Sequence, residues 1–249
     1  MLRISLIAAG VMLLLSTQAM GAVDEARNTI TVNGYANVHA KPDVAYITLY
    51  VKSGGILMTD AANKAAQTAA DLEKTLREKH KQISDIAITS VSVGSKQGDF
   101  SFSDQKNESP SPEVTKRLRI TLPPDQELIY GVLDTGIRAG AIMQNQTSIR
   151  FEGDMNSIVV YSHKDSTEFE NQARAKALED ARQNAEKTAT LIGRKVGEIV
   201  SVGSMNNTSW PAEFLMMGRQ ADLPAKFTSV DPSSVDVPCM LTITYELLK

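Results

Sequence analysis

Alanine recurs at every fourth position of one long stretch, and this spacing constrains the fold more than any other feature of the sequence. The alanines are Ala173, Ala177, Ala181, Ala185 and Ala189. Residues four apart lie on one face of a helix, so the sequence predicts a helix over about 166–192. Its row of methyl groups lets it lie close on a sheet or on another helix. Asp165-Ser166-Thr167-Glu168 resembles a capping box at its start, and Gly193 ends it.

The rest of the chain mixes two further helical patterns with strand patterns of period two. Helices are predicted over about 59–79 and between Asp125, a capping residue, and Gly140. Strands are predicted over 30–38, 45–51, 86–93, 114–122, 149–151, 196–202 and 235–245. The first two strands, joined by Lys41-Pro42-Asp43, are expected to form an antiparallel hairpin. Several strands have one polar face, which indicates an α+β fold of two-layer, antiparallel-rich sheets with helices packed on one face, in two lobes.

The first residues have the pattern of a cleavable secretory signal. Arg3 is positive, residues 4–15 are apolar apart from Ser5 and Gly10, and Ala19 and Gly21 are small residues placed before a cut at Ala22. A membrane anchor is the alternative, but twelve helical residues rise only about 18 Å against a hydrocarbon core of about 30 Å. We expect residues 1–21 to be a signal peptide and residues 22–249 to form one domain. This domain is expected in the periplasm, either free or associated with the outer membrane.

Two long segments interrupt the predicted elements. Residues 97–113 and 206–234 are rich in turn-forming residues and are expected to be flexible loops, and an inner lobe is expected over about 83–152. The second loop gathers the large apolar residues Trp210, Phe214, Leu215, Met216 and Met217. These five form a candidate interface for another subunit or a partner. The alternative is that the loop folds back and covers the core.

Composition excludes several classes of function. The chain has 26 Lys+Arg against 29 Asp+Glu, a balance that gives no long-range attraction to nucleic acid. Aromatic residues make up only 5%, which argues against a platform that stacks bases. The single cysteine rules out an internal disulfide framework or a multi-cysteine metal cluster. No second long apolar run follows the first, so no transmembrane span is expected in the mature chain.

No catalytic or cofactor motif stands out. His39, His80 and His163 are far apart in sequence, do not have the spacing of a zinc site and are interpreted as surface residues. Cys239 is the one reactive candidate, but it shares strand parity with the apolar Val237, so a buried, inert thiol is expected. We expect no catalytic residue, metal or cofactor.

Four stretches resemble the SIMPL-domain family. They are Ile30-Thr-Val-Asn-Gly34-Tyr-Ala36 with Pro42-Asp43-Val-Ala45-Tyr-Ile47; Asp85-Ile86-Ala-Ile-Thr89; Gly140-Ala141; and Ala173-Arg174-Ala-Lys176-Ala177 running to Val196-Gly197-Glu-Ile199. The resemblance implies a two-lobed α+β fold, export to the bacterial cell envelope, self-association, and a link to envelope or oxidative-stress phenotypes. It offers no catalytic motif.

Three functions follow as hypotheses. The first is an exported envelope protein that is not an enzyme and acts as a self-assembling scaffold, a binding module or a stress-protective factor, as a homo-oligomer or with an envelope protein partner. The second is a periplasmic hydrolase with an unrecognised site, which a close group of Ser, His and an acid would favour. The third is a carrier of a small ligand, which would need a large enclosed apolar pocket.

Overall fold

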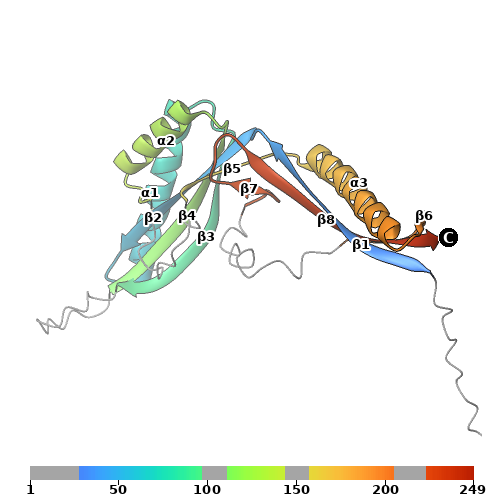
Figure 1. The fold of residues 1–249 in the computed structure, drawn as a ribbon. Coiled ribbons are helices and arrows are strands. Elements are labelled where there is room, and N and C mark those ends of the chain that lie inside the picture. The colour runs from blue at the N-terminus through green and yellow to red at the C-terminus, as the bar shows by residue number, and fades with distance from the viewer. Residues whose placement is uncertain (1–27, 97–110, 144–156, 205–222) are drawn as a thin grey trace, which may run out of the picture.

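The computed structural model describes residues 28–96, 111–143, 157–204 and 223–249, which form two antiparallel sheets and three helices (Figure 1). The elements in chain order are β1 (Thr29–Ala40), β2 (Val44–Gly54), α1 (Met58–Lys79), β3 (Asp85–Lys96), β4 (Ser111–Leu122), α2 (Gln126–Arg138), β5 (Val159–Ser162), α3 (Thr167–Leu191), β6 (Lys195–Ser204), β7 (Thr228–Ser229) and β8 (Val235–Leu248). The expected α+β class is confirmed. The predicted strand at 149–151 lies outside the described residues.

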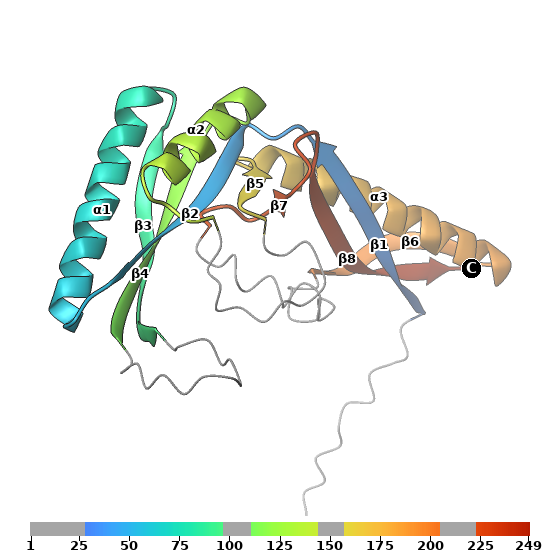
Figure 2. The same ribbon diagram turned by 90° about the vertical axis from the view of Figure 1, so that its left-hand side faces the viewer.

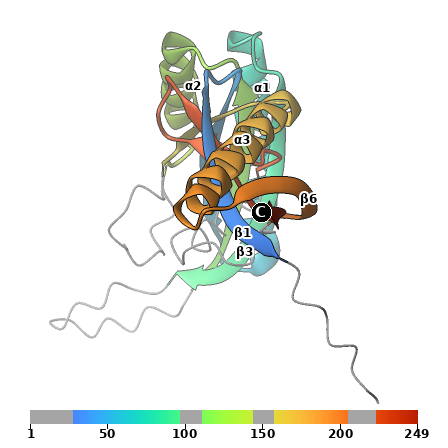
Figure 3. The ribbon, with the colours of Figure 1, turned by 45° about the vertical axis from the view of Figure 1, so that its right-hand side comes forward.

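The first lobe is a three-stranded sheet in the order β1-β8-β6, with α3 lying across one face (Figure 3). All five alanines of the α3 stripe are buried, and three of them pack with Leu241, Ile243 and Tyr245 of β8. The close approach is also set by Gly34 on β1. A Cβ atom there would lie 1.9 Å from the backbone oxygen of Ala177. The predicted close contact is thus between an alanine stripe and a glycine.

The second lobe is a five-stranded sheet in the order β3-β4-β2-β5-β7, with α1 and α2 on its left-hand side in Figure 1. Its core gathers Leu72 and Leu76 of α1, Ile129 and Val132 of α2, and the inward residues of β2 and β4. This sheet extends beyond the predicted inner lobe of about 83–152. It includes β2, which precedes that range in the sequence, and β5 and β7, which follow it. β4 begins at Ser111, inside the predicted loop 97–113.

The predicted hairpin of the first two strands is wrong. β1 pairs with β8, whereas β2 pairs with β4 and β5. The reason lies in β2 itself, because its first four residues, Val44 to Ile47, are all buried, as in a central strand with neighbours on both sides. Asp43, at the turn, is held by β5 instead. Its N–H donates to the Ser162 carbonyl at 3.1 Å, and its carboxylate accepts from the Lys164 N–H at 2.9 Å.

The two lobes are joined where the chain passes from β1 to β2, from β5 to α3 and from β7 to β8 (Figure 2). Val235, at the start of β8, belongs to the core of the five-stranded lobe, while Val237 packs under α3. Phe227 contacts both clusters. The predicted capping box at the start of α3 is wrong, because the N-cap is Ser166, whose side chain caps no backbone N–H, and Asp165 only accepts from the Thr167 N–H at 2.9 Å. The ends of α2 follow the predicted chemistry. The Asp125 carboxylate accepts from the Leu128 N–H at 2.9 Å, and Gly140 has the positive φ of 91° that a left-handed C-terminal residue needs.

Candidate functional site

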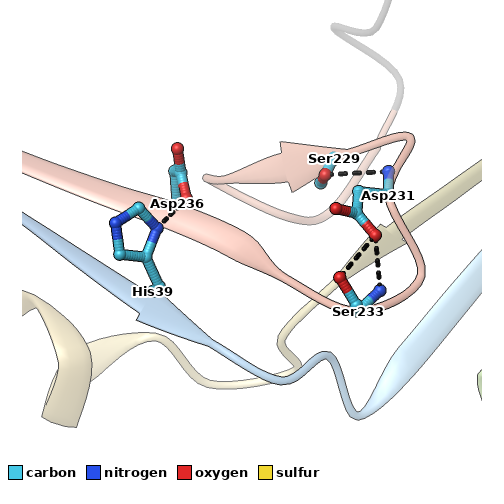
Figure 4. Close-up of polar contacts among 5 residues, drawn as sticks. All are labelled: His39, Ser229, Asp231, Ser233 and Asp236. Carbon is cyan, nitrogen blue, oxygen red and sulfur yellow. Dashed lines mark hydrogen bonds and ion pairs between the residues drawn. The ribbon is translucent and has the colours of Figure 1, made fainter.

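A histidine and an aspartate meet where β1 and β8 approach the junction of the lobes (Figure 4). His39 and Asp236 are directly opposite residues of the two strands, and His39 Nδ1 lies 2.6 Å from Asp236 Oδ1. A hydrolase would need a nucleophile beside this pair. The nearby hydroxyls of Ser229 and Ser233 are instead directed to Asp231. Ser233 Oγ donates to Asp231 Oδ1 at 2.7 Å, and Ser229 Oγ accepts from the Asp231 N–H at 3.0 Å.

The electrostatics around this pair are those of an exposed surface. The side chains of His39 and Asp236 are 67% and 57% exposed, so their contact competes with water and adds little to stability. The hydrogen bonds from Ser233 lower the pKa of Asp231 and keep it ionised. Asp231 therefore acts as the centre of a turn that leads the chain from β7 into β8. The arrangement holds a negative charge in place and provides no activated hydroxyl.

The other histidines have structural surroundings. His80 Nε2 lies 2.9 Å from Thr135 Oγ1 and links the end of α1 to α2. His163 is buried, with its ring centroid 4.6 Å from that of Phe169, so the interpretation of all three histidines as surface residues is wrong for this one. Its burial follows from its position directly after β5, where the chain enters the junction between the lobes. Within the described ranges, no group of three His, Cys, Asp or Glu side chains is arranged to hold a metal ion.

Cys239 is a half-buried thiol on β8, less enclosed than the sequence predicts. It packs against the cluster of Val38, Ala173 and Val237. Removal from water raises the pKa of its thiol, and Arg174 opposes this rise only in part. The thiolate that would act as a nucleophile is therefore disfavoured.

The edges of the two sheets differ in whether another strand can add to them. An edge strand exposes unpaired N–H and C=O groups that a further strand can use. At β1, side chains of α3 occupy such groups. Asp180 Oδ2 accepts from the Tyr35 N–H at 2.9 Å, and Asn184 Nδ2 donates to the Asn33 carbonyl at 3.3 Å. The β7 edge is only two residues long. Both edges are poor templates for pairing.

The edges at β3 and β6 are open in the described part of the chain. Each is the outermost strand of its sheet, and each exposes branched apolar side chains. Those on β3 are Ile88, Val91 and Val93, exposed by 50%, 55% and 62%, and those on β6 are Ile199, Val200 and Val202, exposed by 48%, 39% and 55%. Both strands are long, with 12 and 10 residues. A long, uncovered, apolar edge is typical of a surface for strand pairing.

The sequence did not indicate these edges. Its candidate interface of Trp210, Phe214, Leu215, Met216 and Met217 lies outside the described residues, so it stays a prediction. The apolar residues of β3 and β6 were visible as strand patterns. Their exposure follows from the strand order, which period-two alternation does not contain.

No helix among the described residues is long and apolar enough to cross a membrane.

The fold and its edges define a two-lobed α+β protein built from antiparallel sheets with helices on one face. Comparison with protein families gives a match over residues 30–245 to SIMPL, described as a protein of unknown function (DUF541). The chain therefore belongs to the SIMPL family. No curated protein matches it significantly.

Proposed function

We propose that this chain is an exported protein of the bacterial cell envelope that works without catalysis, as a scaffold assembled from copies of itself. The single observation that carries the proposal is the contrast between sheet edges. β1 is blocked by Asp180 and Asn184, whereas β3 and β6 each expose three branched apolar side chains. Edges left exposed in this way promote association through strands.

The pairing of His39 and Asp236 gives the hydrolase alternative no support. Ser229 and Ser233, drawn with the pair in Figure 4, instead form hydrogen bonds with Asp231. Export is supported by the pattern of residues 1–21, with its apolar run and the small residues Ala19 and Gly21.

Light scattering on the mature chain tests self-association. We expect a mass above that of the monomer, rising with concentration. Val93→Lys combined with Val202→Lys should return the mass to that of the monomer, because each lysine places a charge on an edge that pairing would bury. Tyr130→Lys is the matched control, since Tyr130 is 62% exposed on α2 and away from both edges. A strict monomer at high concentration contradicts the proposal.

Export is tested separately in a Gram-negative host. The product in the periplasmic fraction should begin at Ala22, as measured by intact mass. An uncleaved product that stays in the cytosol would contradict the proposed location without bearing on assembly.

A further inference from the structure

The two open edges are not equally suited to pairing. β6 shows two register shifts against β8, between Val196 and Ile199 and between Ile199 and Ser201, and it carries Glu198. Bulges and charges both hinder the addition of a strand. β3 has one shift, between Ile88 and Ser90, and then pairs with β4 without interruption as far as Lys96. Residues 86–95 of β3 carry no charge. The second half of β3 is therefore the more regular edge.

The pattern of small residues and valines in this half of β3 is the same in both directions. The sequence Ser90-Val91-Ser92-Val93-Gly94 alternates small residues and valine symmetrically about Ser92. Two copies related by a two-fold axis through Ser92 would place Val91 of each opposite Val93 of the other. A centre at Val91 or Val93 would instead leave valine opposite Thr89 or Ser95. The arrangement with its axis through Ser92 places valine opposite valine in both pairs and brings no like charges together.

Both valines lie on the face of the sheet that carries the helices. Val93 is paired with Val114 of β4, which is buried beneath Ala61 and Ala65 of α1, and Val91 lies two residues before Val93 on the same side. α1 packs mainly on β4 and β2 and reaches β3 only near its start, where Ile86 is buried in the same core as Leu72 and Leu76; Val91 and Val93 further along stay exposed. A second β3 would continue this face and bring its own α1 alongside. The occupant that fits this edge is a second copy of the chain.

We propose that two copies pair through β3 in antiparallel orientation about Ser92, which joins their five-stranded sheets into one continuous sheet. This inference rests on the proposed self-association and specifies its first contact. It fixes a register that single-cysteine variants can measure.

Disulfide cross-linking in a Cys239→Ser background tests the register. Opposite residues in an antiparallel pair have Cα atoms about 4.5–5.5 Å apart, within the range of about 4.4–6.8 Å that a disulfide accepts. Ser92→Cys should therefore cross-link under mild oxidation. Ser90→Cys is the matched control on the same edge, because its two copies would be four residue rises, about 13 Å, apart. Ser201→Cys probes β6.

We expect the covalent dimer to form at least ten-fold faster with Ser92→Cys than with either control, at protein concentrations where scattering shows association. Val91→Lys should weaken the dimer at least ten-fold, while Val202→Lys leaves it unchanged, and circular dichroism should show that both variants fold. An oligomer that cross-links equally at Ser90, or preferentially at Ser201, overturns the β3 register and leaves self-association standing. A monomer in scattering overturns both.

Discussion

Gly34→Ala tests whether α3 is held on its sheet by the contact of an alanine stripe with a glycine. The added Cβ would lie 1.9 Å from the Ala177 backbone oxygen and 2.7 Å from the Ala181 Cβ. Neither atom can move by a side-chain rotation, so α3 itself must shift away from β1. Overpacking of this kind costs typically about 1–3 kcal/mol. Because the obstacle is backbone, we expect the upper end, about 3 kcal/mol, which corresponds to a fall in Tm of about 6–12 °C for a chain of this size.

Thermal unfolding followed by circular dichroism measures this effect. Gly203→Ala is the matched control, since Gly203 lies in β6 of the same sheet and a Cβ there would meet only the Thr242 oxygen, at an ordinary 3.6 Å. We expect its Tm to stay close to that of the wild type or to rise slightly, because alanine reduces the entropy of the unfolded chain. Equal Tm values for Gly34→Ala and the wild type would refute the account of how α3 packs.

Three further predictions concern single side chains. Asp125→Ala removes the cap that Leu128 uses and should cost about 1 kcal/mol, seen as a lower urea midpoint; an unchanged midpoint would contradict the role of the cap. Lys226 and Ser166 lower the pKa of Glu170, so its contribution is present above its unfolded pKa and is lost as pH falls through the folded value. The stability difference between wild type and Glu170→Gln should therefore shrink on acidification, and a difference independent of pH would exclude the linkage. Desolvation raises the pKa of Cys239, so a thiol reagent at pH 8 should modify it more slowly than a small free thiol, and a similar rate would refute its shielding.

Helices and strands could be predicted from the sequence better than the pairing between strands. All three helices form where periodicity predicts them, because each helix is specified by contacts within one stretch. Strand pairing depends on distant residues, and β1 pairs with β8, with Thr29 opposite Glu246. Alternation indicates a strand without naming its partner. The uninterrupted apolar run Val44-Ala45-Tyr46-Ile47, all buried in the structure, was the one sequence signal that β2 is central. β5 and β7, with 4 and 2 residues, are too short to show a period.

The candidate surfaces were harder to predict for a related reason. His39 and Asp236 become neighbours only through the register of β1 and β8, and nothing in the sequence near either residue indicates the other. The hydrogen bond between Asp180 and the edge of β1 could not be predicted either, because in the sequence Asp180 is only one of several charged residues of the helix. Its contact with the Tyr35 N–H requires knowing which strand lies beneath α3. The candidate interface residues 210–217 could be selected from the sequence because large apolar residues are unusual in a segment rich in turn-forming residues.

The position of each helix over its sheet determines which edges remain open. α3 reaches the edge of its sheet because alanine and Gly34 allow it to lie directly on β1, and Asp180 and Asn184 then come within hydrogen-bonding distance of that strand's backbone. α1 packs instead on β4 and β2 and leaves β3 without equivalent partners among the described residues. The small residues that bring α3 close therefore also protect β1 from pairing. Because Val91 and Val93 stay exposed, the second half of β3 is the edge segment most available to a second copy.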